Sequence, residues 1–313
     1  MQIAGKLCLL AGVLVGAWLG PIGARAESVV NIAQHFGTNS APFTVIREHK
    51  LLEKRVPGLR AEWHKFSSGT DTNEAFLSGS IDVSAMGIAP FITAWSKGVP
   101  VRMMSGLVVG PVKLVTYRDD IKTIRDFKPN DRIAVPSPAS AQAMMLRMAA
   151  KKLMGDAKAM DALMVGLPHP EAMTALLNKT QITAHFATPP FLDQEIAAGM
   201  RVVLDSVDAV GEAYSGQIVA ATQKFHDKEP QAFAALRDAL KEAVEWLNGD
   251  PVRAARLLKE ADGYKTSVDE LAKTISGENR YDHVARGVMP FVTFMAEQGM
   301  LRRVPGSLAD LTW

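Results

Sequence analysis

The chain has 313 residues, of which 48% are hydrophobic and 22% are charged, and its formal net charge is +2. These values are typical of one or two globular α/β domains, and they exclude a disordered or fibrous protein. Basic and acidic side chains nearly balance, so we expect no nucleic-acid partner, because such proteins carry a clear positive footprint.

Residues 1–26 have the pattern of a secretory signal peptide. Lys6 precedes an apolar run over residues 7–19, and a small-x-small cleavage site lies at residues 24–26. The run is too short to span a membrane comfortably, and Pro21 interrupts the segment after it. We therefore predict cleavage after residue 26 and a periplasmic mature protein.

The predicted cleavage changes the charge and the cysteine content of the chain. Removal of residues 1–26 takes away Lys6 and Arg25, which leaves 33 basic against 33 acidic side chains. The single cysteine, Cys8, leaves with the same segment. The mature chain would then have no thiol, which excludes thiol catalysis, cysteine–metal sites and disulfides.

Strand-like and helix-like segments alternate through the first two-thirds of the mature chain. Residues 29–32 and 61–66 have strand patterns, and a helical pattern lies between them. The Asp71–Glu74 segment resembles a capping box, Gly79 would end that helix, and a further strand would begin at residue 81. The alternation predicts βαβ units and mainly parallel sheets.

Two segments about 100 residues apart have the same pattern. Residues 74–91 and residues 174–191 each contain a helix, a turn, a strand and a loop that closes on Pro-Phe. This similarity predicts two related α/β domains whose strand-end loops face each other across a ligand cleft. The alternative is that any α/β chain repeats helix, turn and strand, and it stays open at this point.

The chain becomes helical in its last third. Apolar residues recur at helical spacing over residues 233–247, Asp250-Pro251 begins a second helix, and Ser267–Glu270 forms a capping box for a third. The chain leaves the first domain near Lys113 and returns near Gln217, so we expect these helices to pack on the first domain. A separate helical domain would need a linker, and none precedes this region.

The sequence carries no recognisable catalytic or metal-binding motif. None of the seven histidines has metal-ligand spacing, and no acidic cluster resembles a calcium loop. The chain also lacks G-x-S-x-G, a dinucleotide fingerprint and a P-loop. We therefore predict binding without turnover, with no metal and no cofactor.

One junction suits the capture of an anion. Residues 133–135 form a short apolar strand that runs into small hydroxyl residues at the start of a helix. Ser137 is expected to cap this helix, Ser140 and Gln142 add polar groups, and Gly155 ends it. Free N–H groups at such a helix start attract anions, although plain helix capping explains the same residues.

Four sequence motifs, in their order along the chain, resemble those of a known family. They are Ser-Gly-Ser-Ile-Asp-Val at residues 78–83, Gly-x-Ala-Pro at residues 87–90, Arg-Ile-Ala-Val-Pro at residues 132–136, and the serine-rich helix start after it. From about residue 29 to residue 205 the chain looks like the periplasmic solute-binding proteins of ABC importers in the nitrate/taurine/alkanesulfonate (NitT/TauT) group.

The resemblance implies a type II periplasmic binding protein with two α/β lobes. Each lobe would have a mainly parallel sheet flanked by helices, and the helical C-terminal region would pack on lobe 1. The implied divisions are a signal peptide at 1–26, lobe 1 at 27–115 and 217–313, and lobe 2 at 116–216.

By position, the resemblance also implies which residues contact the ligand. They come from both lobes: His35, Phe36, Thr38, Asn39, Ser68, Gly69, Thr70, Gly87, Ile88, Ser137, Ser140, Ala141, Gln142, Thr188 and Phe191. The first loop departs from the family pattern, because relatives often have Gly-aromatic-x-Pro where this chain has Gln-His-Phe-Gly at residues 34–37. That departure bears on the identity of the ligand more than on the fold.

The composition of these loops points to an organic ligand. They contain no arginine or lysine, which a site for bare nitrate would more readily include, and they supply several phenylalanines and histidines. We expect a small organic anion, either sulfonate (taurine-like) or carboxylate, delivered by a monomer to a membrane permease with a cytoplasmic ATPase. The alternatives are a neutral heterocycle such as a pyrimidine precursor, or a same-fold enzyme that uses pyridoxal phosphate to make pyrimidines.

Overall fold

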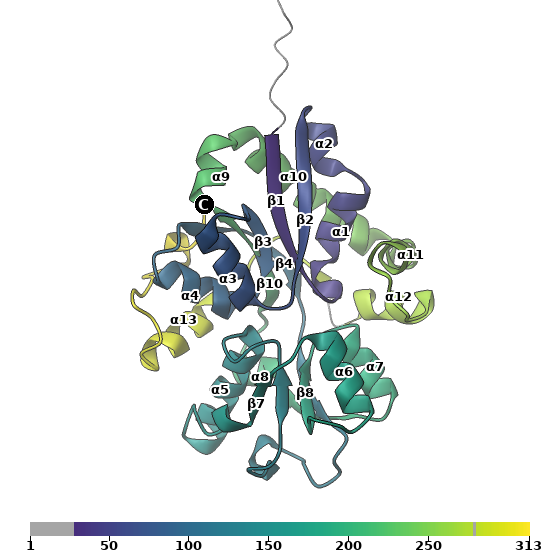
Figure 1. Ribbon diagram of the computed structural model, residues 1–313, viewed down its shortest axis with the longest axis vertical. Helices are drawn as coiled ribbons and strands as arrows, with labels where there is room; N and C mark the ends of the chain where they lie inside the picture. The colour runs from purple at the N-terminus through teal and green to yellow at the C-terminus, as the bar shows by residue number, and fades with distance from the viewer. Residues whose placement is uncertain (1–27, 278–279) are drawn as a thin grey trace, which may run out of the picture.

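The computed structural model describes residues 28–277 and 280–313, so the predicted signal peptide lies outside the described residues. Two lobes lie one above the other in Figure 1, and each contains its own sheet with helices on its faces. The first lobe has a six-stranded sheet and the second a five-stranded sheet. The mixed α/β, two-lobed architecture predicted from the sequence is confirmed.

The first sheet has the strand order β11-β4-β10-β3-β1-β2. Its strands are β1 (Ser28–His35), β2 (Leu59–Phe66), β3 (Val83–Met86), β4 (Val101–Val109), β10 (Ser215–Thr222) and β11 (Arg280–Tyr281). All four residues of β3 are buried, as expected for an inner strand covered on both faces.

The second sheet has the strand order β7-β6-β8-β5-β9. Its strands are β5 (Lys113–Thr116), β6 (Ile133–Val135), β7 (Met164–Gly166), β8 (Ala184–Ala187) and β9 (Arg201–Asp205). Strand β6 pairs in parallel with β7 and β8, and β5 pairs antiparallel with β8 and β9.

In each sheet most strands run in the same direction, as expected, and a minority run against them. In the first sheet β1 is parallel to β2 and β3, but β10 is antiparallel to β3 and β4, and β11 is antiparallel to β4. The reason lies in the chain path, because β5 and β10 enter their lobes from the other lobe. A strand that starts at the cleft must run against neighbours that end there.

The same crossing strands fix where the lobes change. Residues 113–116 pair in the second sheet and residues 215–222 pair in the first sheet. The chain therefore passes from one lobe to the other a few residues before each expected division. Those divisions were expected at 115/116 and 216/217.

The two lobes have equivalent strand orders. Five strands of the first sheet, β4-β10-β3-β1-β2, match β9-β5-β8-β6-β7 of the second, with the same pattern of parallel and antiparallel pairs. The segments about 100 residues apart in the sequence are equivalent helix–strand units, α3-β3 and α6-β8. The repeat is therefore structural and not a coincidence of pattern.

Helices cover both lobes. Those of the first lobe are α1 (Ala41–Glu48), α2 (Leu51–Arg55), α3 (Gly69–Ser78), α4 (Ile88–Ser96), α9 (Gln223–Lys228), α10 (Pro230–Gly249), α11 (Pro251–Asp262), α12 (Val268–Ser276) and α13 (Val288–Glu297). Those of the second lobe are α5 (Ala141–Met154), α6 (His169–Leu177), α7 (Phe191–Ala197) and α8 (Ser206–Val210). No helix in residues 28–277 and 280–313 combines the length and apolarity that membrane crossing requires.

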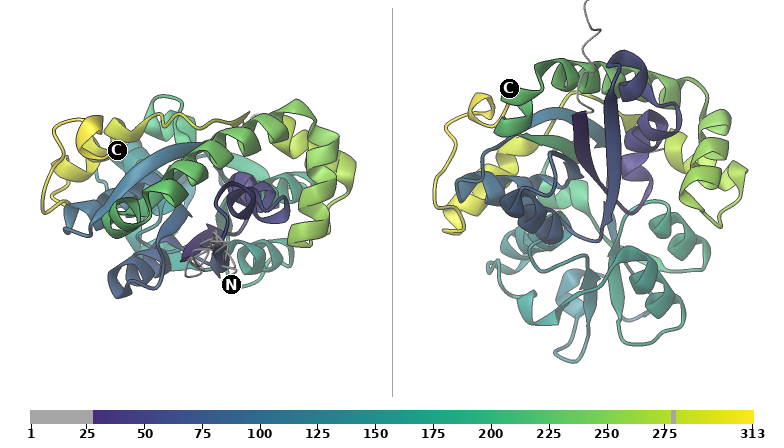
Figure 2. Two further views of the ribbon diagram at one scale, coloured as in Figure 1. Left: turned by 90° about the horizontal axis from the view of Figure 1, so that it is seen from above. Right: turned by 45° about the horizontal axis from the view of Figure 1, so that its top comes forward.

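The helical C-terminal region packs on the first lobe, as predicted. Helix α10 lies across that lobe in Figure 2 and contacts α1, α2, β4 and β11. Its apolar face, which includes Phe233, Leu236 and Leu247, is buried in the same core as β1 and α1. The predicted caps are also present, because Asp250 caps α11 and Ser267 forms a capping box with Glu270.

Candidate functional site

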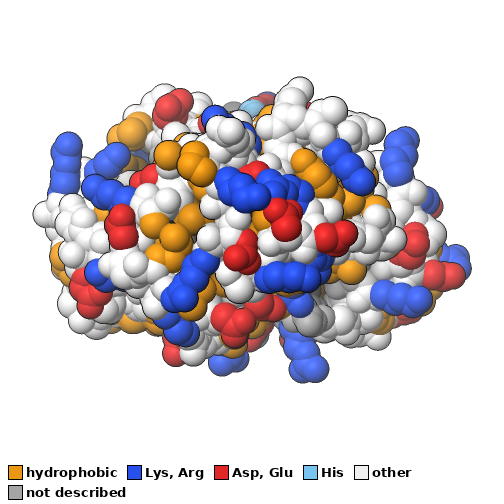
Figure 3. Space-filling model, turned by 90° about the horizontal axis from the view of Figure 1, so that it is seen from below, with side chains coloured by type: hydrophobic (Ala, Val, Ile, Leu, Met, Phe, Trp, Pro, Cys, Tyr) orange, Lys and Arg blue, Asp and Glu red, His pale blue; other side chains and the backbone are white. Residues whose placement is uncertain are grey.

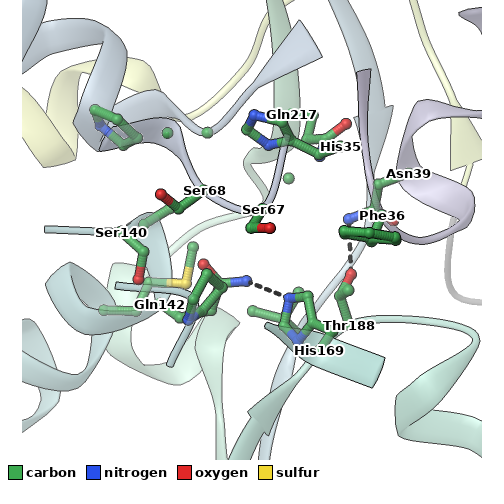
Figure 4. Close-up of a pocket in the computed structure, with 18 residues that line it drawn as sticks. His35, Phe36, Asn39, Ser67, Ser68, Ser140, Gln142, His169, Thr188 and Gln217 are labelled. Atoms are coloured by element: carbon green, nitrogen blue, oxygen red, sulfur yellow. Dashed lines mark hydrogen bonds between the residues drawn. The ribbon is translucent and has the colours of Figure 1, made fainter. Parts of the chain in front are cut away.

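A small cavity of about 50 Å³ lies between the two lobes (Figure 4). Loops at the ends of β1, β2 and β3 form its upper wall, and the loops after β6, β7 and β8 form its lower wall. Its lining residues are His35, Phe36, Asn39, Ser67, Ser68, Gly69, Gly87, Pro90, Val112, Pro136, Ser140, Ala141, Gln142, Met145, His169, Thr188, Gly216 and Gln217.

Three helices begin at this cavity. Helices α3 and α4 reach it from the first lobe and α5 from the second, and their N-cap residues Ser68, Gly87 and Ser140 all line it. The first N–H groups of a helix have no acceptor within the helix, and the helix dipole makes this end positive. The cavity is therefore suited to negative charge although no Lys or Arg lines it.

The two serine caps are set by local hydrogen bonds. Ser68 Oγ accepts from Asp71 N–H at 3.3 Å, and the Asp71 carboxylate accepts from Ser68 N–H at 3.1 Å. Ser140 Oγ accepts from Ala143 N–H at 3.2 Å. These contacts correct two expectations, because Ser68 caps α3 in place of the Asp71–Glu74 box, and Ser140 caps α5 in place of Ser137.

Ten of the fifteen residues expected at the site line the cavity. They are His35, Phe36, Asn39, Ser68, Gly69, Gly87, Ser140, Ala141, Gln142 and Thr188. They come from strand ends and helix starts of both lobes, which is where the sequence placed them.

The other five expected residues lie beside the cavity and do not line it. Thr70 and Ser137 join their hydroxyls at 3.0 Å across the rim between the lobes. Thr38 donates its N–H to Pro189 O at 3.1 Å. The remaining two are Ile88, which is buried in the core, and Phe191, whose ring stacks on His169 with centroids 5.7 Å apart.

Eight lining residues were not among the expected contacts. Ser67 precedes an expected residue in the same strand-end loop, so the strand-end rule could have included it. Gln217 lies on the crossing strand β10 and accepts a hydrogen bond from Ser40 Oγ at 2.8 Å, and no local pattern marks it. The others are Pro90, Val112, Pro136, Met145, His169 and Gly216.

The lobes are in contact around the cavity. Asn39 Nδ2 donates to Thr188 Oγ1 at 2.9 Å across the cleft (Figure 4). A Cβ atom added to Gly87 would come within 2.9 Å of Ala141 Cβ, so glycine allows the starts of α4 and α5 to approach closely. The structure therefore has a closed cleft.

A buried chain of side chains leads from the cavity into the second lobe. Gln142 Nε2 lies 3.3 Å from His169 Nε2, and His169 Nδ1 lies 2.8 Å from His185 Nε2. His185 Nδ1 in turn lies 2.6 Å from Glu195 Oε1. Neither His185 nor Glu195 has any exposed surface. No local sequence pattern indicates this chain, because its members come from α5, α6, β8 and α7.

Burial keeps these groups neutral. It lowers the pKa of His185 to about 3 and that of His35 to about 4, although Asp71 acts in the opposite direction on His35. Burial also holds the pKa of His169 well below its usual value and raises the pKa of Glu195 to about 9. The cavity wall thus carries no fixed charge from these side chains at neutral pH.

Charges of both signs are spread over the end face of the second lobe, which Figure 3 shows. In that lobe Arg118 pairs with both Asp120 and Asp131. No surface of a single sign dominates this face. Within the described residues, no three His, Cys, Asp or Glu side chains gather where they could hold a metal ion.

Residues 23–260 match the model of the NMT1-like family, and the chain belongs to this family. A protein of Escherichia coli strain K12 named for binding aliphatic sulfonates is 29% identical over 141 residues. That match covers 44% of this chain, and the chain spans less than half (43%) of the length of this curated relative.

Two solved structures have the same fold. The alkanesulfonate-binding protein SsuA from Xanthomonas axonopodis pv. citri, bound to MOPS, has a TM-score of 0.75 at 19% identity, covering 93% of this chain and 99% of that one. The nitrate-binding protein NrtA from Synechocystis PCC 6803 has a TM-score of 0.71 at 16% identity, covering 92% and 86%. The resemblance to the NitT/TauT group of periplasmic binding proteins is confirmed.

Proposed function

We propose that this chain is the periplasmic ligand-capturing subunit of an ABC importer and that its ligand is a small organosulfonate. The observation that carries the proposal is the convergence of the starts of α3, α4 and α5 on one closed cavity. Each helix start contributes only about 0.3–1 kcal/mol toward an exposed anion and more when partly buried, so three together suit a singly charged head group.

No Lys or Arg is among the residues that line the cavity, and this favours a moderate affinity for the ligand. A buried ion pair loses much of its attraction to desolvation, whereas N–H groups and serine hydroxyls bind an anion without that penalty. Import requires release as well as capture. Residues 110–112 and 211–214 link the lobes, and we propose that they act as the hinge on which the cleft opens and closes.

One buried acceptor narrows the ligand class further. Asn39 lines the cavity and is only 5% exposed, and no group in the described residues donates to its Oδ1 atom. A buried acceptor without a partner is unfavourable by about 1–3 kcal/mol. A ligand that carries an amine or hydroxyl as well as the sulfonate, such as taurine or 2-hydroxyethanesulfonate, would satisfy it.

A neutral heterocycle is the second candidate, because a cavity wall without charge also suits a pyrimidine precursor. The pyridoxal-phosphate enzyme has less support, since a lysine would normally hold that cofactor and none of the cavity-lining residues is a lysine. We therefore propose binding without turnover, in a protein that acts as a monomer and docks on a membrane permease.

Calorimetric titration of the mature chain with a ligand panel tests the proposal. The panel contains taurine, 2-hydroxyethanesulfonate, a short-chain carboxylate, nitrate and an aminopyrimidine. We expect one-to-one binding of at least one of the two sulfonates, tighter than that of nitrate. Binding of the aminopyrimidine alone would support the second candidate, and recovery of a chemically altered ligand would contradict binding without turnover.

A further inference from the structure

The hydrogen bonds of the buried chain from Gln142 to Glu195 all run in one direction, from donor to acceptor, and the position of the protons sets that direction. A neutral imidazole has one N–H donor and one acceptor nitrogen, so a row of two histidines passes hydrogen bonds one way or the other. If Glu195 carries a proton, its hydroxyl donates to His185 Nδ1. His185 Nε2–H then donates to His169 Nδ1, which leaves an N–H at His169 Nε2.

The opposite direction applies if Glu195 is a carboxylate. It then accepts from His185 Nδ1–H, His185 Nε2 accepts from His169 Nδ1–H, and His169 Nε2 becomes an acceptor. His169 Nε2 is the end of the chain that meets Gln142 at the cavity (Figure 4). The protonation of a residue that never touches the cavity therefore decides whether the cavity wall offers a donor or an acceptor.

The surroundings of Glu195 favour the protonated acid. Its side chain is fully buried, and its second oxygen, Oε2, has no hydrogen-bond partner in the described residues. A buried carboxylate with one oxygen unpaired would lose much of its solvation without compensation. Burial raises the pKa of Glu195 to about 9, and no charged neighbour opposes this shift.

The other titratable groups on the elements around Glu195 are directed elsewhere. On α6, Glu171 is exposed, and on β5, Lys113 lies 3.4 Å from Asp205. On α7 itself, Asp193 accepts a hydrogen bond from Thr274 of α12. The group that contacts the Glu195 carboxyl is His185 of β8, whose pKa burial lowers to about 3.

We propose that Glu195 is a positioning residue that, through His185 and His169, orients the side-chain amide of Gln142 so that its N–H group donates to an anionic ligand. His169 Nε2–H then donates to the side-chain oxygen of Gln142, which faces His169 after half a rotation of the amide. The N–H2 group of Gln142 is left to donate to the ligand. The cavity thus gains a donor in the second lobe without gaining a charge. This inference rests on the proposed function, because it assigns a role in anion recognition within the same cavity.

Nitrogen-15 NMR of the histidine rings tests the direction without any ligand. We expect His169 and His185 of the wild-type chain to carry the proton on Nε2 at pH 7, with His169→Gln and His185→Gln variants used to assign the signals. Protons on Nδ1 of both rings would overturn the inference. This measurement does not depend on whether a sulfonate binds.

Binding at different pH values tests the role of Glu195. The probe is 2-hydroxyethanesulfonate, whose charge stays constant from pH 6.5 to 10. If only protonated Glu195 is competent, the wild-type dissociation constant should be level up to about pH 8 and about tenfold higher at pH 10. Glu195→Gln, whose amide can donate to His185 as the acid does, should bind as the wild type does at pH 7 and stay level to pH 10.

Glu171→Gln is the matched control, since it removes the same charge from an exposed site on α6. Its dissociation constant should depend on pH as that of the wild type does. A tenfold loss for folded Glu195→Gln at pH 7, or a decline above pH 9 as steep as that of the wild type, would overturn the inference. Failure of the wild type to bind any sulfonate would instead contradict the proposed function, and the ring tautomers would still decide the direction of the chain.

Discussion

The two lobes share a strand order but present different chemistry to the cleft. The first lobe contributes two helix starts, α3 and α4, and one partly buried histidine, His35, which forms a hydrogen bond with Thr72 Oγ1 at 2.8 Å. The second lobe contributes the start of one long helix, α5. The hydrogen-bonded side chains from His169 to Glu195 lie beside it. The repeated architecture places backbone donors at the cleft in both lobes, and the side chains behind them make the lobes distinct.

The different numbers of these histidines in the two lobes predict how the stability of the protein changes with pH. His35, His169 and His185 stay neutral in the folded protein because burial lowers their pKa values, but they take up protons when unfolded. The unfolded state then binds more protons below pH 6.5, so stability falls as the pH falls. Each histidine contributes a loss of up to about 2 kcal/mol between pH 6.5 and 5.

Glu195 acts in the opposite direction, because its folded pKa of about 9 means that the folded state keeps a proton that the unfolded state loses above its usual pKa. Urea unfolding between pH 8 and 5 should therefore show a net loss of stability below pH 6.5. His35→Asn should remove about a third of the histidine contribution, and the larger part should remain with the second lobe. A free energy of unfolding that stays level from pH 6.5 to 5 would contradict this account.

A smaller effect is expected where the lobes meet. Gly87 has an ordinary backbone conformation, with φ of −70°, so a side chain there causes no backbone strain. It would, however, meet Ala141 of the second lobe and hold the cleft open. Gly87→Leu should weaken sulfonate binding about 10- to 100-fold, the scale of an overpacked contact, while the free protein keeps its melting temperature.

Gly166→Ala is the matched control for this variant, because a Cβ atom at Gly166 would make only ordinary contacts, the nearest at 3.6 Å. Titration calorimetry with the sulfonate that binds the wild type measures both variants. Unchanged affinity in Gly87→Leu would show that binding does not need the closed contact between α4 and α5.

Local sequence patterns predict most of the fold because they depend on neighbours along the chain. Glycine after α5 and the Ser267–Glu270 box mark their helix ends whatever the tertiary context. The pattern places the start of α5 three residues too early, since Ser137 and Ser140 are both good caps. Ser137 instead bonds Thr70 of the other lobe, a contact that no local pattern contains.

The candidate site likewise contains residues that the sequence predicts and residues that it does not. Its strand-end and helix-start residues could be predicted from topology and from the family resemblance, and ten of them line the cavity. Gln217 and the chain from His169 to Glu195 could not, because their partners lie on other elements.

The most direct test of the account is whether a negative charge at the start of α5 abolishes sulfonate binding. Aspartate caps helices as well as serine does, so Ser140→Asp should keep the fold while its carboxylate repels the ligand. Titration with 2-hydroxyethanesulfonate should show binding by the wild type, about 1–2 kcal/mol weaker binding by Ser140→Ala, and none by Ser140→Asp. Ser137→Asp, outside the cavity lining, should still bind. If Ser140→Asp binds the sulfonate as tightly as the wild type, the helix starts do not hold the head group and the central claim is wrong.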